Sequence, residues 1–222
     1  RGKYGVSVTT TITELERNRV SVVFNVVEGE VSKIKQINLV GNLAYPEEEL
    51  LDLMKLSTPG WFSWFSSSDQ YSKQKLSADL ETLRSFYMDN GYLEFNIDST
   101  QVSITPDRKD IFITINFSEG GKFTVANVSV SGDTLVPKAE IEQLVQVRTG
   151  DTFSRQALNE TSKKIGERLG QEGYAFANVN AIPEIDREKL QVSFDFMVDP
   201  GQRVYIRRIN IAGNDKTRDE VI

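Results

Sequence analysis

Asp and Glu are the residues of this sequence that are numerous enough to suggest acid–base catalysis. The chain has 32 Asp and Glu residues but neither Cys nor His, which excludes thiol nucleophiles, imidazole bases, disulfides and the usual zinc ligands. Two carboxylates can act as general acid and base, but no acidic residue recurs here at a catalytic spacing. Both glycine-rich phosphate-binding motifs are missing. The sequence predicts no catalytic residue, no cofactor, no metal site and no enzyme.

The charge of the chain indicates which partners to exclude. Its formal net charge is -6, whereas a nucleic-acid partner requires a basic face that releases counterions from the phosphates. No stretch approaches the roughly 20 apolar residues of a membrane-spanning helix. We therefore expect no nucleic acid as a partner, and the lack of Cys is compatible with the periplasm.

Three pairs of glycines recur along the chain at one fixed spacing. In each pair the second glycine lies in a short turn, 12 residues after the first. The pairs are Gly29 and Gly41, Gly120 and Gly132, and Gly201 and Gly213. Two Gly-Tyr pairs, which begin at Gly91 and Gly173, mark another repeated position. The repeat lengths are 91 and 81 residues, and the longer copy contains an insertion near Trp61–Gln70.

The residues between these glycines predict the same elements in each copy. β-Branched residues predict a first strand at 34–40, 123–130 and 204–211. A proline opens a first helix in each copy, at Pro46 and at Pro137. A serine is the expected N-cap of a longer second helix, at Ser72 and at Ser154. Alternating apolar residues then predict two strands. The module therefore reads strand, helix, helix, strand, strand.

Structural roles are expected for five of the glycines. Turn glycines permit a positive φ at the end of the first strand, and the Gly-Tyr glycines end the second helix in the left-handed region. These residues are Gly41, Gly91, Gly132, Gly173 and Gly213.

The module order, the Gly-Asn turn and the Gly-Tyr helix end resemble POTRA, the polypeptide-transport-associated repeat. The resemblance covers essentially the whole chain and is closest in Ile37–Asn42, Asp79–Tyr87 and Phe95–Ser103. It implies an α+β fold of tandem repeats, each with two helices packed on a three-stranded mixed sheet.

The resemblance also implies domain limits. Residues 28–119 and 120–200 are expected to be complete repeats that resemble the third and fourth of a longer array. Residues 1–27, with alternating apolar residues from Val20 to Val26, are expected to end a truncated repeat. Residues 201–222 are expected to begin another that resembles the fifth.

The resemblance implies a periplasmic array ahead of a membrane β-barrel in a Gram-negative outer-membrane protein. Its implied role is to receive unfolded outer-membrane proteins and to dock lipoproteins of the assembly machinery, with a propeller-type lipoprotein at the 28–119 repeat. The chain's own C-terminal β-barrel, absent from this sequence, is a further implied partner. The alternatives are a passive spacer array and the POTRA region of a transporter that secretes a dedicated partner protein.

In such repeats the strand after Gly-Tyr is a sheet edge, which can accept an extended peptide as an additional strand. It is expected at 93–104 in the first complete copy and at 176–182 in the second. The predicted partner-binding residues of the first edge are Asn96, Asp98, Thr100, Val102 and Ile104. Those of a possible second edge are Phe176, Asn178, Asn180 and Ile182.

The first of these strands changes phase along its length. Leu93, Phe95 and Ile97 alternate on one face, whereas Val102 and Ile104 are in the opposite phase. Two explanations remain open. Either a β-bulge re-phases the strand and leaves both residues in the core, or they form an outward apolar pair beside Asp98 and Thr100.

Two other segments have weaker claims to a binding role. The aromatic cluster Trp61–Phe65 can anchor to a partner or pack over the helix pair, and packing is the expected outcome. Arg207-Arg208 is expected to be a solvated pair on an exposed strand rather than a contact with an acidic partner.

Overall fold

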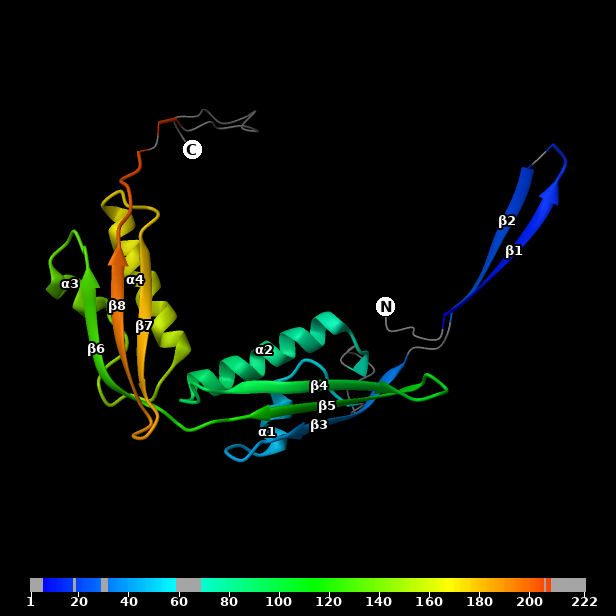
Figure 1. Cartoon of the computed structure of the whole chain (residues 1–222), viewed down its shortest axis with the longest axis horizontal. Helices are drawn as coiled ribbons and strands as arrows, with labels where there is room; N and C mark the ends of the chain where they lie inside the picture. The colour runs from blue at the N-terminus through cyan, green and yellow to red at the C-terminus, as the bar shows by residue number, and fades with distance from the viewer. Residues whose placement is uncertain (1–5, 18, 29–31, 59–68, 206, 209–222) are drawn as a thin grey trace, which may run out of the picture. The chain divides into compact units, whose positions relative to one another are not determined.

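The computed structural model describes residues 6–17, 19–28, 32–58, 69–205 and 207–208. Within them the chain forms one β-hairpin and two α+β modules (Figure 1). The chain divides into two compact units after Phe123, and Thr152–Arg155 group with the first unit. The aromatic cluster Trp61–Phe65 and Gly213 lie outside the described residues, as do residues 206 and 209–211 of the strand expected at 204–211. The described residues of that range, 204, 205, 207 and 208, are not in a strand, so the prediction is not met there.

The hairpin consists of β1 (Ser7–Leu15) and β2 (Arg19–Val27). The two strands are antiparallel, with Ser7 opposite Val27 and Leu15 opposite Arg19. The strand predicted from the alternating apolar residues after Val20 is confirmed as part of β2.

The first module contains β3 (Lys33–Val40), α1 (Glu47–Asp52), α2 (Lys73–Asp89), β4 (Asn96–Ile104) and β5 (Asp110–Ser118). Its sheet has the order β3-β5-β4, with β3 parallel and β4 antiparallel to the central β5 (Figure 1). The predicted module order and the mixed three-stranded sheet are confirmed.

The second module repeats this plan with β6 (Thr124–Gly132), α3 (Lys138–Leu144), α4 (Arg155–Gln171), β7 (Asn178–Asp186) and β8 (Gln191–Asp199). The order is β6-β8-β7, so β8 is the central strand (Figure 1). Residues of β5 and β8 correspond at an offset of 81, and those of β3 and β6 at an offset of 91.

Each central strand has one fully buried face. In β5 every second residue is buried, from Ile111 to Phe117, and these side chains pack against Leu50 of α1 and Leu83 of α2. The same alternation runs along β8 from Val192 to Val198. Both helices of a module therefore cover one face of its sheet, and the apolar periodicities of strand and helix meet in one core.

The turn glycines are required by close backbone packing. Gly41 has a φ of 109°, and a Cβ atom there would lie 1.9 Å from the carbonyl oxygen of Phe117. Gly132 has a φ of 83°, and its Cβ would lie 2.2 Å from the carbonyl oxygen of Val198. Gly91 and Gly173 also have positive φ at the ends of the long helices. The four described glycines thus have the predicted conformation, since a side chain at φ above zero is strained.

Several local predictions need correction. Ser72 occupies the N-cap position of α2, but its hydroxyl donates to Gln74 and caps no backbone N–H. The first helices are short, and α1, which the sequence predicted to begin near Pro46, ends at Asp52 after six residues.

The predicted edge strands begin too early. β4 starts at Asn96, because Leu93 and Phe95 donate their N–H groups into a turn at Gly91 and Tyr92. Phe176 precedes β7 and lies in a comparable turn, in which Ala177 N–H donates to the carbonyl of Tyr174.

Candidate functional site

β4 and β7 are edge strands of their respective sheets. Each pairs on one side with the central strand of its module, which leaves the backbone groups of the other side open to an additional strand. The geometry of these two edges decides which of them can accept a polypeptide.

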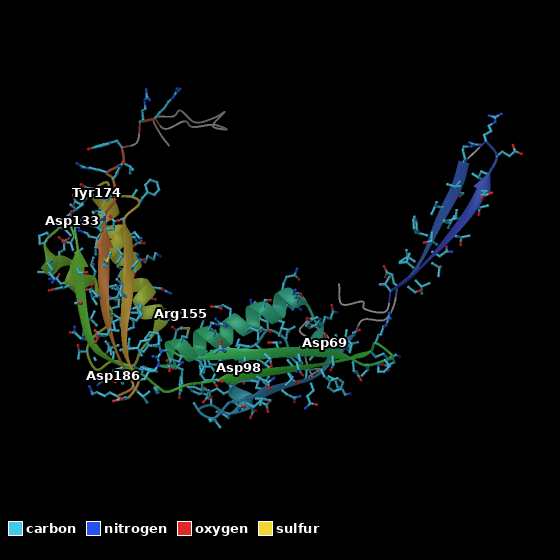
Figure 2. All side chains as sticks on the ribbon, viewed as in Figure 1. Asp69, Asp98, Asp133, Arg155, Tyr174 and Asp186 are labelled. Carbon is cyan, nitrogen blue, oxygen red and sulfur yellow. The ribbon has the colours of Figure 1, made fainter. Side chains whose placement is uncertain are left out.

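β4 contains a bulge at Asp98. Ile97 lies opposite Phe117 and Ser99 opposite Asn116, so Asp98 is an extra residue without a partner in β5. Its carboxylate accepts from Asn96 Nδ2 at 2.8 Å and from Ser118 Oγ at 2.6 Å. Asp98 lies on the sheet of the first module (Figure 2), and these two bonds fix the bulge between neighbouring polar side chains.

The bulge re-phases the strand, as one of the two sequence explanations required. Beyond it, Thr100, Val102 and Ile104 lie opposite the buried Ile115, Ile113 and Ile111, on the face that the helices cover. They do not enter the core, however, because Val102 and Ile104 keep 36% and 39% of their surface exposed. The phase was therefore explained correctly by the bulge, whereas the expected burial is wrong.

The predicted binding residues of β4 consequently divide between two faces. Asn96 lies opposite the exposed Ser118 and faces away from the helices, and Asp98 binds both of these residues. Thr100, Val102 and Ile104 share the helix-side face. The second sequence explanation, in which Val102 and Ile104 form an outward pair on the same face as Asp98, is therefore wrong, because the extra residue shifts the alternation by one position.

The backbone of β4 is open at the residues that carry the exposed apolar side chains. Thr105 N–H donates to the carbonyl of Asp110 at 3.0 Å, which identifies the first hydrogen-bonded pair of the hairpin. Such pairs alternate along an antiparallel ladder, so Ser103 and Gln101 also bond to β5. Between them, Val102 and Ile104 point their N–H and C=O groups to the open edge.

Two stacked aromatic rings, those of Phe95 and Tyr87, position the start of β4. The ring of Phe95, directly before β4, stacks on Tyr87 of α2 with a centroid distance of 4.3 Å. Tyr87 is buried, and its hydroxyl donates to Glu119 Oε1 at 2.7 Å. Burial and this hydrogen bond to a carboxylate raise the pKa of Tyr87 far above its ordinary value. The phenol therefore stays protonated and keeps donating throughout the neutral range.

Glu119 also ties the end of β5 to the turn after β3. Its carboxylate accepts the N–H groups of Leu43 and Ala44 at 2.9–3.1 Å. The same side chain thus connects the helix, the central strand and the first turn of the module. This buried network holds the sheet on which the β4 edge is presented.

β7 differs from β4 in having no bulge. Its pairing with β8 runs without a register shift from Asn178 to Asp186, which lies where β7 meets the hairpin loop (Figure 2). Asn178, Asn180 and Ile182 lie opposite Asp199, Met197 and Asp195, whose side chains are not buried, and so face away from the helices. Phe176 is 79% exposed in the turn before the strand.

The open edge of β7 also lacks one hydrogen-bond donor. Pro183 lies opposite Phe194, and this pair corresponds to Val102 opposite Ile113 in the first module. Because proline has no N–H to give to β8, its nitrogen faces the open edge. β7 therefore offers an added strand an interrupted ladder at the position where β4 offers Val102. The alignment of the two repeats contains this signal, but the sequence prediction did not use it.

Other kinds of site find little support within the described ranges. They contain no group of three or more His, Cys, Asp or Glu side chains placed to hold a metal ion. No helix in the described part of the chain is long and apolar enough to cross a membrane. At the hairpin tip, hydrogen bonds from Thr105 and Lys109 lower the pKa of Asp107, which stabilises the turn.

Comparison with known proteins agrees with this architecture. The chain is 37% identical to the outer membrane protein assembly factor BamA of Neisseria meningitidis serogroup B over its whole length, which is 28% of that protein. It is 32% identical to BamA of Buchnera aphidicola over 93% of the chain and 34% of the relative. The chain therefore spans about a third or less of these relatives.

A solved structure shows the same fold. The crystal structure of Haemophilus influenzae BamA POTRA3-5 matches with a TM-score of 0.73 and 25% sequence identity, covering 86% of this chain and 74% of that one. These relationships confirm the expected location of the repeats in the periplasmic portion of a Gram-negative outer-membrane protein.

The family model for POTRA, described as a surface antigen variable number repeat, matches residues 32–120 and 123–201. These two segments cover both α+β modules with their mixed sheets and paired helices. The two matches account for most of the described residues, and the chain belongs to the POTRA family.

Proposed function

We propose that these repeats are a non-enzymatic scaffold for outer-membrane β-barrel assembly that receives unfolded outer-membrane proteins as an added strand at β4. The observation that carries the proposal is the open backbone edge at Val102 and Ile104, in a chain similar to assembly factors named BamA. We further propose that the complete protein has a membrane β-barrel, toward which these clients are passed.

Strand addition suits clients of many sequences. Backbone hydrogen bonds supply much of the affinity and are indifferent to the side chains of the added strand. The exposed flanks of Val102 and Ile104 add an apolar surface beside these bonds, and outer-membrane barrel strands carry apolar side chains at every second position. The site therefore favours extended, alternating segments without selecting one sequence.

We propose that the client edge of this chain is β4 rather than β7. At β7 a strand would meet Pro183, which gives no N–H where Val102 gives one. Proline on an edge strand is a common protection against strand addition. The second repeat then supports the array and contributes little to client capture.

The experiment that tests client binding is an NMR titration of the labelled chain with unfolded porin peptides. We expect shifts at the amides of Thr100, Val102 and Ile104 at millimolar peptide and smaller shifts in β7. Absence of any edge-strand shift at that concentration would contradict client binding.

A variant pair separates backbone from side-chain effects. Val102→Pro copies the second repeat and removes the outward N–H, so we expect about tenfold weaker peptide binding, the factor that one hydrogen bond contributes. Val102→Thr keeps both the N–H and a branched side chain, and should bind as the parent chain does. Equal binding by both variants would argue against strand addition at this position.

We also propose that the first repeat docks an accessory lipoprotein of the propeller type on the same surface. Val102→Glu or Ile104→Glu places a charge on the exposed apolar pair, so lipoprotein capture by the tagged chain should fall. Unchanged capture would remove this patch as the docking site. A passive spacer, the competing function, would tolerate deletion of one whole repeat, whereas a docking module would lose a named partner.

A further inference from the structure

A groove lies between the other edge of the second sheet, β6, and helix α3. It has a volume of about 620 Å³. Three consecutive residues of β6 line it, namely Val128, Ser129 and Val130. Successive side chains of a strand point to opposite faces, so a groove that contacts three in a row lies along the strand edge and reaches its backbone.

The first repeat has the corresponding groove between β3 and α1. There a carboxylate of the repeat itself, that of Glu47, accepts a hydrogen bond from the strand edge. This groove is smaller, about 350 Å³, and is lined by Ile37, Glu47 and Leu51 among others. Leu39 N–H, on the open side of β3, donates to Glu47 Oε1 at 3.0 Å. The first residue of α1 thus accepts from the N–H group that the neighbouring strand points away from its sheet.

The second repeat has the same donor without this acceptor. Val130 lies opposite Phe196 as Leu39 lies opposite Ile115, so Val130 N–H also points to the open side. The position of Glu47 is taken by Lys138, which has three donors and no acceptor. Within the described residues, no side chain or loop carbonyl accepts from Val130 N–H. A buried donor of this kind gains free energy from any acceptor that reaches it.

The charges around the groove favour a negative acceptor. Lys138 and Arg148 both line it, and neither side chain forms an ion pair in the part of the chain that the structure describes. Among the described residues that line it, Glu142 is the single acidic one. The nearby Asp195 is already held by Ser129 and Ser131, whose hydroxyls lower its pKa together with the more distant Lys138. In the first repeat the same groove is lined by Glu47, Glu48 and Asp52, and none of its lining residues within the described ranges is basic.

We propose that the β6–α3 groove binds an acidic side chain of an extended segment of a partner polypeptide. Its carboxylate accepts from Val130 N–H, as Glu47 does from Leu39 in the first repeat, and lies beside Lys138 and Arg148. Apolar side chains next to the acidic residue contact Val128, Val145 and Val147, which also line the groove. This site is separate from β7, which forms the opposite edge of the same sheet.

The probe is a nine-residue peptide that alternates Val and Glu, and its control is the same peptide with Lys in place of Glu. Titrated into the labelled whole chain, the Glu peptide should shift the amide of Val130 and bind at least tenfold more tightly than the Lys peptide. Its affinity should fall as salt rises, because the attraction of exposed charges is screened. Equal affinity of the two peptides, or an unshifted Val130 amide at saturation, would overturn the proposal.

Charge reversal in the groove provides the second arm. Lys138→Glu supplies the carboxylate that the first repeat uses and should reduce binding of the Glu peptide by tenfold or more, the factor of one charge-assisted hydrogen bond. Arg148→Glu should act in the same direction. Lys164→Glu makes the same charge change on an exposed position of α4 and should have little effect.

Site-resolved shifts distinguish this proposal from client binding at β4. Shifts confined to Val102 and its neighbours, with Lys138→Glu binding as the parent chain does, would overturn the groove and leave the β4 edge intact. Shifts at Val130 that disappear in Lys138→Glu and persist in Val102→Pro would support the groove independently of the β4 edge.

Discussion

The two complete repeats share one fold but hold it together with different chemistry. In the first, Asp79 of α2 is fully buried and accepts the N–H groups of Lys55 and Leu56 at 2.8 and 2.9 Å. In the second, Thr161 occupies this position on α4 and accepts from Gln146 N–H at 2.9 Å. The polar pair Tyr87 and Glu119 corresponds to Leu169 and Pro200. The fold therefore requires a side-chain acceptor for the backbone N–H groups after the first helix, and either a carboxylate or a hydroxyl can supply it.

The edges of the two sheets differ in the same systematic way. The first repeat opens β4 at Val102 and fills the edge of β3 with Glu47. In the second repeat, Pro183 removes one N–H group from the open edge of β7, and Lys138 offers no acceptor to the edge of β6. On our proposals, each repeat thus binds a polypeptide at one edge, β4 in the first and β6 in the second, and these two strands lie at opposite edges of their sheets. If both proposals hold, two copies of one fold bind different partners because of a few residue differences at their sheet edges.

The largest expected effect concerns the buried acceptors that distinguish the repeats. Asp79→Ala leaves two backbone donors without a partner and should lower the stability of the first module by about 3 kcal/mol. Thr161→Ala leaves one such donor and should lower that of the second by about 1.5 kcal/mol. Hydrogen exchange at the amides of Leu83 and Ile165 measures both modules in one sample. Equal losses would contradict the distinction.

A smaller effect is expected from the polar pair that only the first repeat has. Tyr87→Phe removes the hydrogen bond to Glu119 and should cost about 1–2 kcal/mol at neutral pH. Because the pKa of Tyr87 is raised on folding, its contribution is fully present below about pH 10, the ordinary pKa of tyrosine, and is lost as the pH rises above it.

Urea unfolding of the first module between pH 8 and pH 11 measures this effect. The parent chain should lose stability more steeply above pH 10 than Tyr87→Phe does. Parallel pH profiles of the two chains would show that the buried phenol is not the group responsible.

The smallest effect concerns the edge of β3. Glu47→Gln keeps an acceptor for Leu39 N–H but removes its charge, and should lower stability by only about 0.5 kcal/mol. Glu47→Lys copies the second repeat and should instead create weak binding of the Val/Glu peptide at Leu39. If Glu47→Lys binds no better than the parent chain at this edge, the acceptor exchange does not explain the difference between the grooves.

Much of this architecture was predictable because the same residue types recur at equivalent positions in both copies. The turn glycines at 41 and 132 keep their spacing because a Cβ there would collide with a carbonyl of the central strand. The phase change before Val102 reduced the possibilities to a bulge or an outward apolar pair, and the structure contains the bulge. Local rules of this kind act within a few residues and are therefore visible in sequence.

The remaining features depend on side-chain contacts that residue type and alternation do not specify. Val102 lies on the helix-side face of an edge strand and still keeps 36% of its surface exposed, which no alternation pattern encodes. Ser72 has the residue type of an N-cap, but its hydroxyl finds Gln74 instead. Glu47 accepts from the edge of β3, and Lys138 offers no acceptor at the edge of β6. This difference becomes visible only when the fold brings the helix residue to the strand edge.

The most direct test of the account exchanges the two edges in one chain. In the double variant Val102→Pro with Pro183→Val, the shifts caused by an unfolded porin peptide should move from residues 100–104 of β4 to residues 181–185 of β7. Stability should change little, because both nitrogens face the open edges and bond to no neighbouring strand. Shifts that remain at β4, or that fail to appear at β7, would contradict the claim that an open backbone edge determines where this chain receives a polypeptide.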